Sequence, residues 1–347
     1  VMVLPVMAFV ARYLIVFYRH TVGLSVYGFL EQRFGPGARL YGSLSFVLNR
    51  ILDISITFYF LAMAISTLSG WPVGTVILAV GLLTVAYTLV GGMTAVVWTD
   101  VAQSVLLVGA GMLCLGVALY GSDMGPFAIL THAWDAGKFS WGSWHLSFRE
   151  DNVWIFLMLS TIWALQRYAT DQHVVQRYLI ARSDCEAIQG AWMAALTSYP
   201  IWILFSTVGA CVWSFYALQG GAPSEIVADA SATMPVFIQS ELPTGTVGLI
   251  VAAVLAAAMS SLDSDMNSIA TAVVDDVYSR LCPAASDSER LKAGRWVVCV
   301  SGGLSVGAAL QWVGVESAVG LMAELFSIAA AGVLGMFLAG MLMPAVD

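Results

Sequence analysis

The chain has 347 residues, of which 59% are hydrophobic and only 10% charged, with a mean hydropathy of +0.84 and a formal charge of -8. An average soluble domain carries about a quarter charged residues, so this composition excludes an ordinary soluble protein and indicates a polytopic membrane protein. The acidic balance, with no basic patch in the sequence, also excludes a nucleic-acid partner.

Apolar runs near or above the roughly 20 residues that cross a bilayer follow one another along the chain. We interpret them as nine transmembrane helices, at about 1–18, 41–69, 72–91, 96–120, 153–180, 188–217, 243–275, 293–313 and 319–343. Several runs are longer than a bilayer requires, which predicts tilted helices or extensions into the loops. The expected fold class is an all-α polytopic membrane protein, placed in the cell (inner) membrane.

Cations gather on alternate loops, and this sets the predicted orientation. If the first helix ends inside, the outer loops hold only Lys138 and Arg149 as cations. The inner loops then hold Arg19, Arg33, Arg39, Arg177, Arg182, Arg280, Arg290, Lys292 and Arg295. The negative net charge therefore reflects mainly an acidic outer surface.

The segment LVGGMTAVVWTDVAQSVLLVG joins the third and fourth predicted helices and carries Thr99, Asp100 and Gln103 at the entrance to an apolar span. Two interpretations of Asp100 stay open. It caps its helix in water at the inner interface, because Asp is favourable at helix starts, or it has a partner within the membrane, where an unpaired carboxylate is costly.

A second polar segment, AAAMSSLDSDMNSIATAVVDD at 256–276, lies in a run apolar enough to enter a membrane. At roughly 3.6 residues per turn, Ala257, Ser260, Ser261, Ser264 and Ser268 fall on one side of a helix. This arrangement predicts an oxygen-lined stripe of the kind that a hard cation such as sodium prefers.

Four separated motifs, VYGFLEQRFG, LVGGMTAVVWTDVAQ, ATDQHVVQRYLIARS and LAAAMSSLDSDMNSIAT, resemble those of the sodium:solute symporter family, in the same order and over nearly the whole chain. The resemblance implies an inverted-repeat transporter fold of two five-helix halves, with sites near the midplane where helices are broken. The nine spans would then match the second to the tenth core helix. On this interpretation residues 1–347 form a single transporter domain, incomplete at both ends and lacking the first core helix.

Carried over residue by residue, the resemblance places the main sodium site at the carbonyl of Ala257 and the hydroxyls of Ser260 and Ser261. Relatives that bind a second sodium ion imply a further site at Asp100, Ser260, Asp263 and Ser264. A hydroxyl residue is common in such relatives at position 263, so the aspartate is a departure. It either contacts an ion or turns away to cap or pair elsewhere, whereas Asp265 and Asn267 are expected to meet neighbouring helices or water.

The same resemblance predicts a substrate pocket that includes Asp53, Arg167 and Ser198. For Asp53 the alternative is an intrahelical pair with Arg50, one turn earlier. In WALQRYATDQ, the residues Gln166, Arg167 and Tyr168 lie near an expected helix break. Arg167 stands about where sugar-transporting relatives have an aromatic gate, and a buried arginine could clamp a carboxylate. It could instead neutralise Asp53.

These features predict a sodium-coupled symporter that imports a small polar organic solute, such as a sugar, a sialic acid or a carboxylate, by alternating access. The expected partners are sodium, the solute and the lipid bilayer, and no cofactor is implied beyond sodium as the coupling ion. The sequence shows no convergent catalytic set, so an enzyme is not expected, and no repeated pore ring that would indicate a channel. A solute sensor on the same fold is the alternative.

Overall fold

The structure is a computed structural model that describes residues 2–23, 25–147, 152–221, 233–243, 245–315, 332–341 and 343, with the side chains of 90–100 outside the description. Within these ranges, six helices are long and apolar enough to cross a membrane: Val3–Thr21, Pro36–Ser69, Val101–Tyr120, Asp184–Leu218, Thr246–Leu281 and Asp287–Gln311. Two shorter apolar helices, Val73–Leu89 and Gly332–Met341, accompany them. The prediction of a multi-pass helical membrane protein is therefore confirmed.

The first span contains a π-helical segment, because it divides into α1 (Val3–Phe9), η1 (Val10–Leu14) and α2 (Ile15–Thr21). A short helix, α3 (Gly28–Phe34), follows, and then the long α4 (Pro36–Ser69). Gly35 separates α3 from α4 with φ of 88°, a left-handed conformation that glycine adopts without steric cost, and Pro36 then occupies the first turn of α4. The helix thus starts five residues before the predicted run, as an extension into the loop.

The third and fourth predicted helices belong to one helical element, α5 (Val73–Tyr120), which differs from the two separate helices predicted. Its two apolar stretches nevertheless have different neighbours. In the first, Gly81 lies against Val306, whereas in the second Gly111 lies against Phe205. The prediction of two apolar stretches was right, and the helix continues from one to the other because the sequence between them holds no proline to interrupt the hydrogen bonds.

The predicted span at 153–180 is divided into three helical segments, in agreement with the expected helix break. It consists of α7 (Val153–Leu165), the π-helical η2 (Gln166–Thr170) and α8 (Gln172–Leu179). Asp171 separates the last two with an extended conformation (φ -83°, ψ 117°), and its side chain caps α8 by accepting a hydrogen bond from the His173 amide. A π-helical turn followed by an extended residue leaves backbone groups outside the regular helix pattern, which is common at functional sites.

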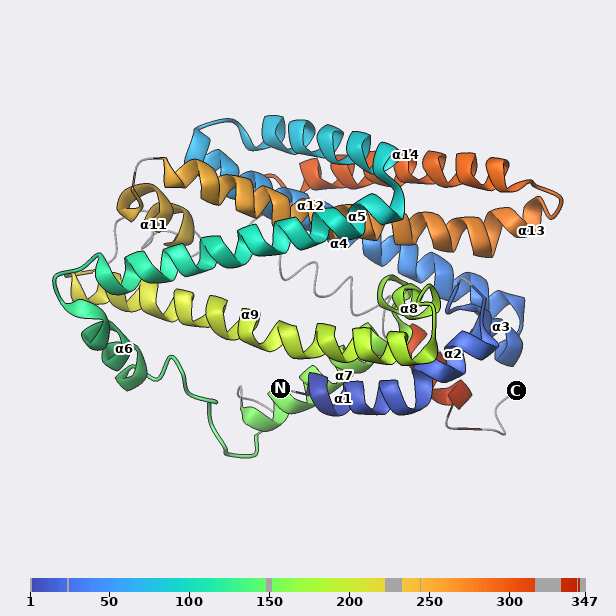
Figure 1. Cartoon of the computed structure of the whole chain (residues 1–347), viewed down its shortest axis with the longest axis horizontal. Helices are drawn as coiled ribbons and strands as arrows, with labels where there is room; N and C mark the ends of the chain where they lie inside the picture. Colours follow the sequence, from blue (N-terminus) through green and yellow to red (C-terminus); the bar gives the residue numbers. More distant parts are fainter. Residues whose placement is uncertain are drawn as a thin grey trace.

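The remaining helices pack partly on α4 and partly on α5. They are α6 (Gly125–Asp135), α9 (Asp184–Leu218), α11 (Thr233–Glu241), α12 (Thr246–Val273), η4 (Val274–Tyr278), α13 (Ser279–Leu281) and α14 (Asp287–Gln311). The helices α4, α12 and α14 contact one another, α9 contacts α5, and these long helices follow the longest axis of the molecule (Figure 1). Of the ninth predicted run, 319–343, the structure describes Gly332–Met341 as a helix, and residues 319–331 lie outside the described ranges.

Glycines allow the first stretch of α5 and α14 to approach closely. A Cβ added at Gly81 would lie 2.4 Å from Val306, and one added at Gly302 would lie 2.4 Å from Val85. Each helix therefore presents a valine over a glycine of the other. Small residues at such contacts let membrane helices pack where lipid offers no hydrophobic driving force.

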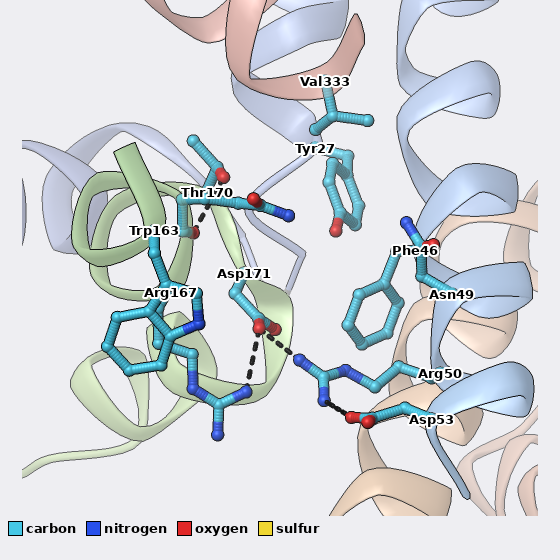
Figure 2. Close-up of a pocket in the computed structure, with 11 residues that line it drawn as sticks. Tyr27, Phe46, Asn49, Arg50, Asp53, Trp163, Arg167, Thr170, Asp171 and Val333 are labelled. Carbon is cyan, nitrogen blue, oxygen red and sulfur yellow. Dashed lines mark hydrogen bonds and ion pairs between the residues drawn. The ribbon is translucent and has the colours of Figure 1, made fainter. Parts of the chain in front are cut away.

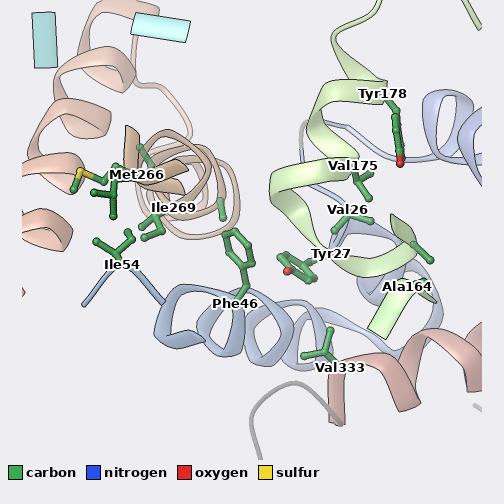
Figure 3. Packing of buried hydrophobic residues seen from close by; sticks show 14 of the residues in the cluster. Val26, Tyr27, Phe46, Ile54, Ala164, Val175, Tyr178, Met266, Ile269 and Val333 are labelled. Atoms are coloured by element: carbon green, nitrogen blue, oxygen red, sulfur yellow. The ribbon is translucent and has the colours of Figure 1, made fainter. Parts of the chain in front are cut away.

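A cluster of buried apolar side chains connects α4 with α8 and α12. Figure 3 shows Phe46 and Ile54 of α4 near Ile269 of α12, and Tyr27 near Val175 of α8. Tyr27 and Phe46 also line a cavity, so the apolar core ends where that cavity begins.

Ion pairs join the start of α4 to the end of the α12 helix through a set that we call the end cluster: Glu31, Arg39, Asp275, Asp276 and Arg280. Arg39 lies 2.8 Å from Glu31, 2.9 Å from Asp275 and 2.6 Å from Asp276, and Arg280 also pairs with Glu31. Because hydrogen bonds from Arg280 and then Arg39 favour the ionised carboxylate, the pKa of Glu31 is held below its ordinary value.

Candidate functional site

A cavity of about 320 Å³ opens between α4 and the broken helix formed by α7, η2 and α8. Its size suits a small organic molecule. Figure 2 shows Trp163 and Arg167 on one side, Phe46, Arg50 and Asp53 on the other, and Asp171 between them. The full lining comprises Tyr27, Phe46, Asn49, Arg50, Asp53, Trp163, Gln166, Arg167, Thr170, Asp171 and Val333.

Arg50 is the centre of the charged groups in this cavity. Its guanidinium lies 2.8 Å from Asp53, 3.2 Å from Asp265 and in hydrogen-bonding contact with Asp171. It also lies over the ring of Phe46, 5.6 Å from the ring centroid. Only 7% of the Arg50 side chain is exposed. Taking such a charge out of water is costly, and three carboxylates compensate for that cost.

Asp171 connects Arg50 to Arg167. The Arg167 guanidinium lies 3.2 Å from the Asp171 carboxylate, one turn along the chain. The Arg167 side chain remains 33% exposed, so it faces the cavity more openly than Arg50 does. The break in the helix is therefore also the point where both arginines meet one carboxylate.

Asp265 brings α12 into the same group of charges. Its carboxylate lies 2.7 Å from the His173 ring as well as 3.2 Å from Arg50. We call Arg50, Asp53, Arg167, Asp171, His173 and Asp265 the pocket network. This network joins α4, the broken helix and α12, so the helix with the serine stripe is in direct ionic contact with the cavity wall.

The serine stripe on α12 changes character along its length. Ala257 and Ser260 are half-buried and Ser261 is exposed, whereas Ser264 is buried. The Ser264 hydroxyl accepts a hydrogen bond from the Arg177 guanidinium at 3.2 Å. The three positions predicted for the main sodium site thus lie on the more accessible part of the helix.

Asp263 is fully buried beneath this stripe, and its carboxylate accepts a hydrogen bond from the Tyr87 hydroxyl of α5. The Asn267 side chain donates to the Asp263 backbone carbonyl at 2.9 Å. Asp263 therefore pairs with a neighbouring helix, and its direct contact with an ion stays a prediction. The expectation that Asp265 meets neighbouring helices is likewise met by Arg50 and His173.

The predicted substrate residues divide into two groups. Asp53 and Arg167 both line the cavity, and Asp53 also makes the intrahelical pair with Arg50. Ser198 is half-buried on α9, its hydroxyl donates to the Ala195 carbonyl at 2.7 Å, and it is not one of the residues that line this cavity. The side chain of Asp100, predicted for the second sodium site, lies outside the described residues.

Sequence reasoning missed three members of the pocket network. The pairs of Arg50 with Asp171 and Asp265, and of His173 with Asp265, join residues far apart in the chain, so no local spacing reveals them. The pair of Asp171 with Arg167 has the local spacing of one helical turn. A partial signal was present, since Asp171 is a charged residue inside an apolar run next to an expected break. An ionisable residue in such a position indicates a functional site.

The family model described as Sodium:solute symporter family matches residues 1–346. The chain belongs to this family. The sequence is 32% identical over 333 residues to the sodium/sialic acid symporter SiaT of Proteus mirabilis (strain HI4320), and this match covers 92% of this chain and 66% of that protein. It is 29% identical over 349 residues to the human sodium/iodide cotransporter, and this match covers 95% of this chain and 52% of that protein. The chain thus spans less than two thirds of the length of these curated relatives.

A solved structure has the same fold with a TM-score of 0.89 and 30% sequence identity, and the match covers 99% of this chain and 71% of that one. It is described as a substrate-bound outward-open state of a Na+-coupled sialic acid symporter that reveals a novel Na+ site. The match confirms the transporter fold predicted from the sequence motifs.

Proposed function

We propose that this protein is a sodium-coupled symporter that moves a small polar organic solute, such as a sugar, a sialic acid or a carboxylate, into the cell by alternating access. The observation that carries the proposal is the pocket network, in which a charged cavity meets the helix that bears the serine stripe. Charged groups within membrane helices are costly, and here they surround a space for a ligand. The matched relatives are sodium-coupled transporters, which supports the same activity for this chain.

The main sodium ion is proposed to bind the Ala257 carbonyl and the Ser260 and Ser261 hydroxyls. Asp265 lies one turn beyond Ser261 on α12 and contacts Arg50 in the cavity wall. A cation that fixes α12 therefore also fixes Asp265, which holds one side of the pocket network. By linkage, sodium then raises the affinity for the solute, and the solute raises the affinity for sodium by the same factor.

A second sodium ion is proposed at Asp100, Ser260, Asp263 and Ser264. Asp263 and Ser264 are both buried on α12, next to the half-buried Ser260. A stoichiometry of two sodium ions per solute would follow from this second site. For the substrate, Asp53 and Arg167 are proposed as contacts from the cavity wall, and Ser198 as a more distant one on α9.

Uptake by the full-length protein in proteoliposomes tests the function. The panel consists of sugars, sialic acids, monocarboxylates and amino acids, each measured with sodium, lithium and potassium gradients. We expect accumulation of one class that requires an inward sodium gradient and stops when the gradient is dissipated. Solute binding without accumulation under any gradient would favour the alternative, a sensor on the same fold.

Two variants separate the proposed ion sites. Ser261→Ala removes one oxygen ligand from the main site, so we expect a lower sodium affinity with the protein still folded. Asp100→Asn keeps the shape and removes the charge, so the Hill coefficient for sodium should fall toward one. If sodium cooperativity is unchanged in Asp100→Asn, the aspartate caps its helix and the protein carries one sodium ion.

A further inference from the structure

We infer that the solute carries a positively charged nitrogen, such as a protonated amine, and that Asp53 is the group that binds it. The inference rests on the proposed function and narrows its substrate class. It is carried by the charge balance of the pocket network, the partners and exposure of Asp53, and the aromatic side chain opposite it.

The first argument is the charge balance of the pocket network. Asp53, Asp171 and Asp265 supply three carboxylates, and Arg50 and Arg167 supply two guanidinium groups. With His173 neutral, the network carries one excess negative charge, and with His173 protonated it is balanced. In neither form is there excess positive charge, so the cavity lacks the surplus cation that would neutralise an anionic solute in a low-dielectric site.

The second argument is how each carboxylate is used. Asp171 pairs with both arginines, and Asp265 pairs with Arg50 and His173. Among the described residues, Asp53 has a single ionic partner, Arg50, and 36% of its side chain is exposed, compared with 11% for Asp171 and 8% for Asp265. Asp53 is therefore the carboxylate with the most capacity left for a ligand in the cavity.

The third argument is the position of the aromatic side chains. Trp163 lines the cavity across from Asp53 and is about half exposed, whereas the ring of Phe46 already lies under Arg50 (Figure 2). A cation between Asp53 and Trp163 would have a carboxylate on one side and an indole ring on the other. Tryptophan is the side chain that attracts cations most strongly through its ring.

The test uses matched sets of small molecules that differ in charge and little in shape. The sets are glucosamine, glucose and glucuronate; ethanolamine, ethylene glycol and glycolate; and cyclohexylamine, cyclohexanol and cyclohexanecarboxylate. Equilibrium binding to the full-length protein in lipid nanodiscs is measured at pH 7 in sodium buffer. We expect the tightest of the nine probes to be an amine that binds at least tenfold more tightly than its neutral and acidic partners. Any other result, including no binding by the three amines, overturns the inference.

The carboxylate is tested with Asp53→Asn. Arg50 keeps Asp171 and Asp265 in this variant, so the fold should be retained, and a thermal melt without solute checks this. We expect the affinity for the tightest amine to fall at least tenfold and that for its neutral partner to stay unchanged. Asp135→Asn, which removes an exposed charge at the end of α6, is the matched control and should change neither affinity. An amine affinity that survives Asp53→Asn would show that Asp53 is not the binding group.

The same experiment separates this inference from the proposed function. Binding is measured at equilibrium and does not require flux, so an amine that binds but is not accumulated with a sodium gradient would contradict symport and leave the amine site intact. A solute that is accumulated with sodium but carries no cationic nitrogen would support symport and contradict the amine site at Asp53.

Discussion

Arg39 and Arg50 lie eleven residues apart on α4, and each is surrounded by three carboxylates. The end cluster around Arg39 joins α4 to η4, and two of its members, Glu31 and Arg280, keep about a third of their side chains exposed. The pocket network around Arg50 joins α4 to α12 and the broken helix, and it lines a cavity. The same chemistry therefore joins the start of α4 to η4 in the first case and lines a cavity in the second.

The largest expected effect follows from removing the centre of the pocket network. Arg50→Met leaves Asp171 and Asp265 buried without their main cation. Breaking a buried pair in this way typically costs about 3–5 kcal/mol, so we expect a severe loss of folded protein. Thermal melts of the purified protein measure the effect, with Arg12→Met as the control because Arg12 is exposed. A melting temperature close to that of the unaltered protein would show that the network does not hold the fold.

The equivalent change in the end cluster should cost less. Of the three partners of Arg39, Glu31 and Asp275 are 30% and 26% exposed and only Asp276 is fully buried. Arg39→Met is therefore expected to lower the free energy of unfolding by about 2 kcal/mol, between the values for surface and buried pairs. Added salt should reduce the loss of unfolding free energy caused by Arg39→Met, since salt screens exposed charges. The comparison between the two regions fails if Arg39→Met is as damaging as Arg50→Met.

A third change separates binding from stability within the pocket network. Arg167 is one-third exposed and contacts Asp171 alone among the described carboxylates. Arg167→Ala should therefore leave the melting temperature nearly unchanged and weaken affinity for a solute with hydroxyl groups about tenfold, through loss of charge-assisted hydrogen bonds. Sodium affinity, measured in parallel, should stay the same. Equal losses of sodium binding and folding would identify a structural pair between Arg167 and Asp171.

The smallest effect is the response of the end cluster to acid. Hydrogen bonds from Arg280 and Arg39 hold the pKa of Glu31 below its ordinary value of 4.5. A carboxyl with a lowered pKa in the folded state contributes stability above pH 4.5, and the contribution is lost as pH falls from there through the lowered pKa. Melts of the unaltered protein and of Glu31→Gln should therefore converge below pH 4.5. A constant difference between them across this range would contradict the role of the Glu31 charge.

The sequence predicts a polytopic membrane protein and the position of most spans, because these depend on local composition. It also predicts the break in the fifth span, through recognisable motifs. Asp53 and Arg167, which the family resemblance assigned to a substrate pocket, line one cavity, and their contact with a solute stays a prediction. The pairing of Asp265 with Arg50 and His173 could not be predicted, since helix periodicity tells which face a residue occupies and not which helix lies opposite. The continuity of α5 was missed for another reason, because a window of hydropathy measures how apolar a stretch is and does not detect where helical hydrogen bonding stops.

The glycine contacts between α5 and α14 have a consequence for motion. Val306 lies over Gly81 and Val85 over Gly302, so sliding one helix along the other would drive each valine toward the larger residues one turn from its glycine. Packed interfaces of this kind tend to switch between discrete arrangements and do not deform continuously. We therefore expect these two helices to travel as one rigid body, so that any rocking during a transport cycle takes place along seams without such interlocks.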